Sequence, residues 1–342
     1  MRRTLALLAM ILPLAAAVEA QNRPDLLVVA NKQAASATVI DVASGRTVAT
    51  LAVGDGPHEV AVSNDAKWAV VTNYGNERAG SSLSIIDLDR LAVTRTLDLA
   101  PHRRPHGAVF LPGDREVAVT SETSQAVLVV NLQAGAVERV LRTGQQGSHM
   151  LVVSPDGKRI YTANVFSGSV TALDVAGVEL ARSVPVAAQT EGIALSPDGR
   201  RLWVGSNQAH TVTVLDAATL APVDTLPSPG MPYRLAVTAD GALVVVPNPM
   251  LSAVRVFDTA AMRETALVRV PPREGFTPAP GEDAGAGPVG VVLSPNGRTA
   301  YVALQGRNQV GVLDVASGRI TGYLDTGAGP DGIAYAARGL RR

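Results

Sequence analysis

The sequence predicts an all-β fold, a seven-bladed β-propeller in which each blade is a four-stranded antiparallel sheet. Two observations lead to this prediction. A strand–turn–strand pattern, first met as GPHEVAVSNDAKWAVVTNYG at residues 56–75, recurs along the 342-residue chain, and a second pair of strands follows each complete copy. Most copies begin about 42 residues after the previous one, the length of one four-stranded propeller blade, and no helical periodicity interrupts them.

The first two strands of each unit alternate apolar and polar residues. In residues 56–75 the stretches EVAVS and WAVVT alternate on either side of a polar turn at residues 64–66. Later turns read Ser-Pro-Asp-Gly, as at residues 154–157, where proline fixes φ early in the turn and glycine accepts a positive φ at its end. There are seven copies, and the second residue of each serves as its marker. The markers are Pro57, Pro105, Ser148, Thr190, Pro232, Pro288 and Pro330.

The last two strands of each complete unit are rich in β-branched residues and carry an aspartate at one fixed position. Stretches such as LSIIDLDRLAVTRTLDL and VGVLDVASGRITGYL illustrate the pattern. We expect this aspartate to cap the turn that follows it. The residues concerned are Asp87, Asp174, Asp216 and Asp314.

The two ends of the chain complete one blade together. The last copy, GPDGIAYAARG from residue 329, supplies a first strand only, whereas residues 25–55 supply a second, third and fourth strand without a first. We therefore expect the ring to close by pairing the C-terminal strand with three N-terminal strands, which removes exposed sheet edges. Residues 21–342 are then a single propeller domain, with residues 271–287, rich in Pro and Gly, inserted as a surface loop on the face of the histidines discussed below.

The N-terminus has the features of a secretory signal peptide. Arg2 and Arg3 precede an apolar run from Leu5 to Ala17, which ends in a small-residue cleavage pattern. We expect residues 1–20 to be removed after Ala20 and the mature protein to be periplasmic or secreted. No later stretch approaches the roughly 20 apolar residues of a membrane-spanning helix.

Charge and composition narrow the class of partner. The 30 Lys and Arg residues balance 30 Asp and Glu residues, so the charge gives no support to nucleic-acid binding. The absence of cysteine excludes thiolate metal sites, redox motifs, a lipoprotein anchor and cysteine nucleophiles. We expect a monomer that binds a small polar ligand or a protein partner.

Short motifs resemble a known family. VVTN at Val70–Asn73, YTAN at Tyr161–Asn164 and VVAN at Val28–Asn31, combined with the Ser-Pro-Asp-Gly turns, resemble the YVTN-repeat or YncE-like family of bacterial propellers. The resemblance covers residues 25–339 and implies the fold more than an activity, because propellers host unrelated functions. The chain also resembles the family of lactonase-type propellers.

The candidate site follows from the geometry of a blade. The loop that enters the innermost strand and the loop between the second and third strands lie on one rim of the ring. Three of the five histidines occupy equivalent positions there, directly after the start of the innermost strand. Duplication of one histidine-bearing blade would also spread the residue without a use for it. Around the ring this position holds His58, His106, His149, Glu191, Tyr233, Val289 and Asp331.

Three functions compete for this rim. The favoured one is a binding mouth at one end of the central channel, without chemistry. The residues expected to bind the ligand or partner are His58, His106, His149, Glu191, Tyr233, Asp331, Asn73, Tyr74, Asn164 and Arg104.

The two alternatives use part of the same set. The resemblance to lactonase-type propellers implies a hydrolase in which His106 and Glu191 act as base and acid and Arg104 binds an anionic group, although no nucleophile motif such as Gly-x-Ser-x-Gly is present. Alternatively, imidazole and carboxylate groups suit a divalent transition metal. The ligands of such a site would be His58, His106, His149 and Glu191. The sequence leaves open whether the protein is an enzyme.

Overall fold

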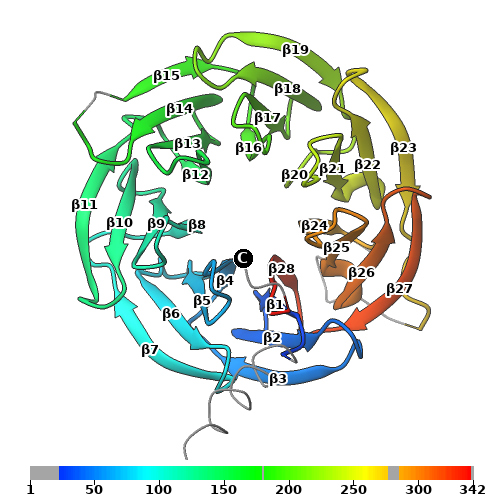
Figure 1. Ribbon diagram of the computed structural model, residues 1–342, viewed down its shortest axis with the longest axis horizontal. Helices are drawn as coiled ribbons and strands as arrows, with labels where there is room; N and C mark the ends of the chain where they lie inside the picture. The colour runs from blue at the N-terminus through cyan, green and yellow to red at the C-terminus, as the bar shows by residue number, and fades with distance from the viewer. Residues whose placement is uncertain (1–22, 179–180, 276–284, 340–342) are drawn as a thin grey trace, which may run out of the picture.

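Seven four-stranded antiparallel sheets surround a central axis in the computed structural model, which describes residues 23–178, 181–275 and 285–339 (Figure 1). The predicted seven-bladed propeller is therefore confirmed. The expected signal peptide and residues 276–284 of the expected inserted loop lie outside the described residues.

Six blades are built from consecutive strands, ordered from the channel outward. Blade 1 contains β4 (Pro57–Val62), β5 (Trp68–Asn73), β6 (Ser82–Asp87) and β7 (Ala92–Asp98). Blade 2 contains β8 (Pro105–Phe110), β9 (Glu116–Ser121), β10 (Ala126–Asn131) and β11 (Ala136–Arg142). Blade 3 contains β12 (Ser148–Val153), β13 (Arg159–Asn164), β14 (Ser169–Asp174) and β15 (Arg182–Pro185).

The next three blades follow the same order. Blade 4 contains β16 (Thr190–Leu195), β17 (Arg201–Ser206), β18 (Thr211–Asp216) and β19 (Pro222–Pro227). Blade 5 contains β20 (Ala236–Val237), β21 (Leu243–Asn248), β22 (Ala253–Asp258) and β23 (Arg263–Arg269), and blade 6 contains β24 (Pro288–Leu293), β25 (Thr299–Leu304), β26 (Gln309–Asp314) and β27 (Arg319–Asp325). Two short 3-10 helices, η1 (Pro249–Leu251) and η2 (Gln305–Arg307), follow β21 and β25.

Blade 7 closes the ring as the sequence predicts. The C-terminal strand β28 (Pro330–Ala336) is innermost and pairs antiparallel with β1 (Leu26–Asn31), which is followed by β2 (Ser36–Asp41) and β3 (Thr47–Ala52). Asp25 fastens the closure, because its carboxylate accepts the Tyr335 hydroxyl at 2.7 Å and the Arg338 amide at 2.7 Å. The two ends of the chain thus share one hydrogen-bonded sheet.

The core lies between neighbouring blades. The second and third strands of a blade are buried on both faces, whereas the outer strands alternate between exposed and half-buried residues, as in β3. Val28 and Val39 of blade 7, for example, pack with Val71 and Ile86 of blade 1. The predicted capping aspartates are also found, since the Asp87 carboxylate accepts the amides of Asp89 and Arg90 at 2.9 Å.

Glycines allow the innermost strands to approach closely where they begin. Four blades carry glycine as the third residue of that strand, and a Cβ there would press on the backbone carbonyl of the second residue in the next blade. At Gly107 the carbonyl concerned belongs to His149 and would lie 2.8 Å from the added atom. The channel is therefore narrow at this end. The four positions are Gly107, Gly192, Gly290 and Gly332.

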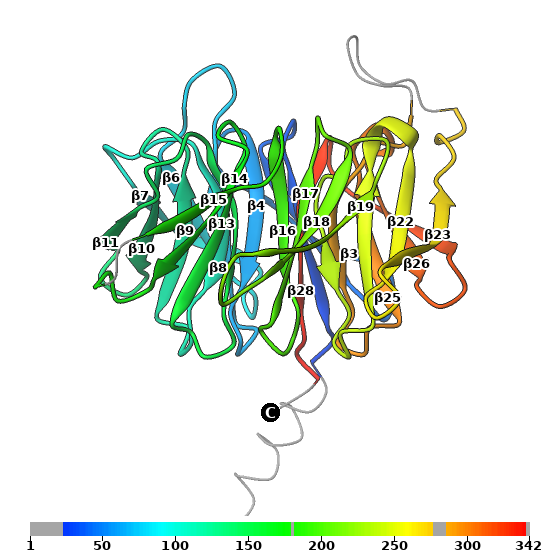
Figure 2. The same ribbon diagram turned by 90° about the horizontal axis from the view of Figure 1, so that it is seen from above.

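The innermost strands begin at one face of the ring and end at the other. Figure 2 shows the ring from the side, with β28 ending at the lower face. The starts of the innermost strands, and with them the candidate site, lie at the opposite face. Within the ranges that the structure describes, no helix has the length and apolar character to cross a membrane.

Candidate functional site

Seven residues at equivalent positions of the blades converge at one end of the channel: six are the second residues of innermost strands, and Tyr233 lies in the segment before β20. We call them the inner ring: His58, His106, His149, Glu191, Tyr233, Val289 and Asp331. His106 and Asp331 are 0% exposed, and all other members except Tyr233 are also buried. The inner ring is thus a plug of packed side chains rather than the lining of an open mouth.

A chain of charge-assisted hydrogen bonds runs through this plug from blade 1 to blade 4. The Tyr74 hydroxyl donates to Glu122 Oε2 at 2.7 Å, and Glu122 Oε1 lies 2.6 Å from His149 Nδ1. On the other side of the imidazole, His149 Nε2 lies 2.6 Å from Glu191 Oε1. His149 therefore stands between two carboxylates, with one ring nitrogen directed at each.

Arg234 of blade 5 extends the network across the channel. Its Nη1 donates to Glu191 Oε1 at 2.6 Å, while Nε and Nη2 donate to Glu59 Oε1 at 2.8 and 2.6 Å. Arg234 and Glu59 are third residues of their inner segments, at the position where four other blades carry glycine. The β20 strand is short at this point, because Pro247 of the neighbouring strand has no N–H to donate to the ladder.

The charges of the network shift the pKa values of its members. Burial disfavours a charged imidazole, but the carboxylates of Glu191 and Glu122 outweigh burial and raise the pKa of His149 to about 9. Burial likewise favours a neutral Glu191, yet His149 and Arg234 lower its pKa to about 2. For Glu59 burial prevails over Arg234, and the pKa lies above the usual value. The pair of His149 and Glu191 is therefore an imidazolium and a carboxylate near neutral pH.

The remaining two histidines are neutral and packed against aromatic rings. His58 stacks on Tyr74 with ring centroids 4.4 Å apart, and His106 lies between His58 at 4.7 Å and His149 at 3.6 Å. Burial lowers the pKa of His58 to about 4. Burial, followed by the positive charge of His149, lowers the pKa of His106 well below its usual value.

Several buried polar atoms of this end have no hydrogen-bond partner among the described residues. They include both ring nitrogens of His106, Nδ1 of His58 and both carboxylate oxygens of Asp331. Lys32 lies nearby, with Nζ 3.2 Å from His58 Nε2 and 4.0 Å from Asp331 Oδ2. Buried polar atoms almost always have partners, so His106 and Asp331 mark the place where this end of the channel can accept a further polar group.

The two asparagines of the expected site form hydrogen bonds that stabilise their own blades. Asn73 accepts the Gly54 amide at 3.0 Å, and its side-chain amide donates to Ser82 and Ser84 of the next strand, each at 3.0 Å. Asn164 donates in the same way to Ser169 and Thr171. Both asparagines therefore hold the second and third strands together at the turn.

The residues expected for lactone hydrolysis do not share an accessible site. His106 is fully buried, and Glu191 is bound to His149 and Arg234. The Arg104 guanidinium lies 4.6 Å above the Tyr74 ring and donates to the carbonyls of Gly75 and Asn76. A substrate could not contact all three groups in this arrangement. Tyr233, the remaining aromatic of the expected mouth, stacks under the Arg234 guanidinium at 4.5 Å.

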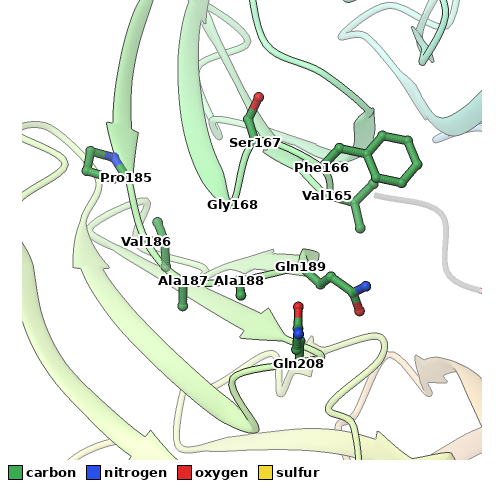
Figure 3. Close-up of a pocket in the computed structure, with 10 residues that line it drawn as sticks. All are labelled: Val165, Phe166, Ser167, Gly168, Pro185, Val186, Ala187, Ala188, Gln189 and Gln208. Carbon is green, nitrogen blue, oxygen red and sulfur yellow. The ribbon is translucent and has the colours of Figure 1, made fainter.

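An open groove, which the sequence did not predict, lies between blades 3 and 4 (Figure 3). Its volume is about 410 Å³, and its residues come from the end of β15 and from the β13–β14, β15–β16 and β17–β18 connections. Phe166 stands over it with 70% of its surface exposed. Phe166 was the available signal, since polar residues normally occupy such turns. The lining consists of Val165–Gly168, Pro185–Gln189 and Gln208.

Comparison with known proteins supports the fold. The chain is 30% identical over 148 residues to "Seven-bladed beta-propeller protein Rv1057" of Mycobacterium tuberculosis, a match that covers 43% of this chain and 36% of that protein. It superposes on Kuenenia stuttgartiensis hydrazine synthase with a TM-score of 0.69 and 19% identity, over 81% of this chain and 88% of the other. A functionally unknown protein from Desulfotomaculum acetoxidans gives a TM-score of 0.72 and 15% identity, over 91% and 98% of the two chains.

The family described as "Cytochrome D1 heme domain" matches residues 117–337. Its description implies a haem, whose iron is held in proteins by His, Cys, Met or Tyr. The residues described here do not fit one, because the three channel histidines pack on one another and Arg234 crosses the channel to Glu59. The groove lining contains none of those four residue types. The match extends over more than half of the sequence, and the chain therefore belongs to the cytochrome D1 heme domain family as a seven-bladed propeller.

Proposed function

We propose that the protein is an exported, YncE-like binding module that recognises an uncharged, extended segment of a protein partner in the groove between blades 3 and 4. The observation that carries this proposal is Phe166, a large aromatic side chain that is 70% exposed at the edge of an open groove. Exposed aromatics are favoured anchors of protein interfaces, because they bury much area at a low cost in conformational entropy.

The chemistry of the groove defines the class of ligand. None of its ten lining residues is charged, so a charged ligand would lose hydration without gaining an ion pair. Gln189 and Gln208 carry side-chain amides, which can both donate to and accept from a peptide backbone (Figure 3). Val165, Val186 and Phe166 offer apolar contacts for alternate side chains of an extended peptide.

The groove is connected to the buried plug through the chain at one of its lining residues. Gln189 directly precedes β16, whose second residue, Glu191, is held by His149 and Arg234. Because the strand that follows Gln189 is fixed by these ion pairs, this side of the groove needs little ordering when a ligand binds, and this reduces the entropic cost of recognition. The expected ligand mouth is thus moved from the inner ring to the groove.

The test is a peptide-display selection on the folded mature protein, followed by calorimetry of the selected peptides with variants. We expect Phe166→Ser to weaken binding at least tenfold, as loss of an aromatic anchor does. Val178→Ser is the matched control, because Val178 is also an exposed apolar residue, at 85%, and lies outside the groove lining. Equal affinity of both variants, or selected peptides that are strongly charged, would refute the proposal.

A further inference from the structure

We propose that His106, His149 and Glu122 form a binding site for a divalent transition-metal ion inside the plug. The three residues come from β8, β12 and the turn after β9, and one ligand atom of each lies within 4.8 Å of the others. This site is separate from the groove and does not depend on the proposed peptide recognition.

His106 gives the first independent indication of a ligand. It is 0% exposed, and neither of its ring nitrogens has a hydrogen-bond partner among the residues described. A buried imidazole normally satisfies at least one nitrogen. A metal ion bound by His106 would use the lone pair of the neutral ring, which is the form in which histidine ligates metals.

The surroundings of His149 match those of a metal-binding histidine. Its Nε2 faces Glu191 at 2.6 Å, and Arg234 holds the same carboxylate oxygen at 2.6 Å. Histidine ligands commonly donate their second N–H to a carboxylate, which fixes the ring orientation and the tautomer. His149 would then bind the ion through Nδ1, the nitrogen that faces Glu122.

Each carboxylate oxygen of Glu122 contacts a different group, as each ring nitrogen of His149 does. Its Oε2 accepts the Tyr74 hydroxyl at 2.7 Å, which leaves Oε1 directed at His149 Nδ1 at 2.6 Å. The Glu122 side chain is 8% exposed, so water competes little for it. Binding would replace the proton between Glu122 Oε1 and His149 Nδ1 with the ion and release that proton to solvent. The two atoms would then move apart, because each would form its own bond of about 2.0–2.2 Å to the ion between them.

The surroundings of the site are rich in acidic groups. Four carboxyl groups lie among three basic groups in this part of the channel, a setting that suits a bound cation. The carboxyl groups are Glu59, Glu122, Glu191 and Asp331, and the basic groups are Lys32, Arg234 and His149.

The donor set selects the kind of metal. Two imidazole nitrogens and one carboxylate oxygen suit zinc and neighbouring transition metals, whereas magnesium and calcium prefer oxygen ligands alone. His58 is outside the set, because the group of ligand atoms that lie within 4.8 Å of one another contains His106, Glu122 and His149 only among the described residues. The site therefore differs from the set expected from the sequence, with Glu122 in place of His58 and Glu191 as an outer partner.

The test measures zinc and cobalt binding to the mature chain after chelator treatment, by calorimetry for Zn²⁺ and by the visible absorption of bound Co²⁺. Because His106 is fully buried, the protein is also refolded in the presence of each ion. We expect one equivalent in the wild type and no stoichiometric binding in His106→Ala or Glu122→Gln. Tyr74→Phe, which removes an outer hydrogen bond, should weaken binding 10- to 100-fold.

Two controls keep the result interpretable. His102→Ala removes a histidine that bonds to Ser124 outside the plug, and His58→Ala removes the inner-ring histidine that is not a proposed ligand. Both should retain one equivalent of metal. Circular dichroism and a cooperative melt establish folding, and Glu122→Gln serves if His106→Ala does not fold. A metal-free wild type after both treatments, or full binding by folded Glu122→Gln, would overturn the proposal.

Discussion

Arg234 and Glu59 are 175 positions apart in the sequence, yet their side chains join across the channel. Two nitrogens of the guanidinium donate to a single oxygen, Glu59 Oε1, at 2.8 and 2.6 Å, while the third donates to Glu191. Both partners are almost fully buried. Blades 1, 4 and 5 are thereby tied together at the narrow end of the ring.

Removing the cation of this tie should destabilise the whole propeller. Arg234→Met keeps much of the side-chain volume but leaves two buried carboxyl groups without their guanidinium. Breaking a buried ion pair in this way costs about 3–5 kcal/mol, measured as the free energy of unfolding in denaturant. Arg201→Met is the control, because its pair with Asp216 is partly exposed and should contribute about 0–1 kcal/mol. Equal losses in both variants would contradict the assignment.

Close contact between innermost strands predicts a position-dependent effect of adding one methyl group. A Cβ at Gly192 would collide with the Tyr233 carbonyl, whereas a Cβ at Gly322 in β27 meets no atom within 4 Å. Gly192→Ala should lower the free energy of unfolding by about 1–3 kcal/mol through overpacking. Gly322→Ala should raise it by about 0.4–1 kcal/mol, since alanine restricts the unfolded chain. Thermal denaturation of the two variants and the wild type measures these changes in stability. A Gly192→Ala variant as stable as the wild type would show that the innermost strands can move apart.

The sequence predicts the positions that repeat in every blade but not the side chains that are particular to one. Blade number, ring closure and the shared end of His58, His106 and His149 follow from a pattern that recurs about every 42 residues. Glu59 and Arg234 could not be found in this way, because each replaces a recurrent glycine in a single blade and its partner comes from a distant repeat.

The sequence also did not predict that the three histidines of the inner ring are buried. A histidine at the start of an innermost strand can either line an open channel end or be packed inside it. Which of the two occurs depends on how closely neighbouring blades approach each other. Glycines such as Gly107 and Gly332 bring the strands together, so the histidines pack on one another. Phe166 could not be found from the repeat, because the equivalent turns of the other blades carry unrelated residues at this position, such as Gln33, Thr123 and Met250.

Export should leave a mature chain that starts at Gln21. Cleavage after Ala20 preserves Asp25, whose carboxylate accepts the Tyr335 hydroxyl and the Arg338 amide at the ring closure. Intact-mass analysis of protein from a bacterial periplasm or culture medium should therefore show the loss of residues 1–20. Leu7→Arg, which interrupts the apolar run, should leave full-length protein in the cytoplasm. A wild-type chain that keeps its first 20 residues would contradict the prediction.

Acid should destabilise the protein through His58. Because burial holds its folded pKa at about 4, below the ordinary value of 6.5, the unfolded chain takes up a proton first as the pH falls. The free energy of unfolding therefore begins to fall below about pH 6.5, and the decrease reaches about 3 kcal/mol near pH 4. His58→Gln should make the free energy of unfolding less dependent on pH in that window. Parallel pH curves for wild type and His58→Gln would exclude a buried neutral histidine.

Alkali should act through His149, in the opposite sense. Its folded pKa of about 9 lies above the ordinary 6.5, so the stability that its proton provides is complete below pH 6.5 and is lost as the pH rises through about 9. The difference corresponds to about 3 kcal/mol. His149→Gln keeps a polar side chain but cannot be protonated, so its free energy of unfolding, measured in urea from pH 6 to 10, should lie below that of the wild type at pH 6 and approach it at pH 10. A constant gap between the two curves would mean that His149 is neutral between Glu122 and Glu191.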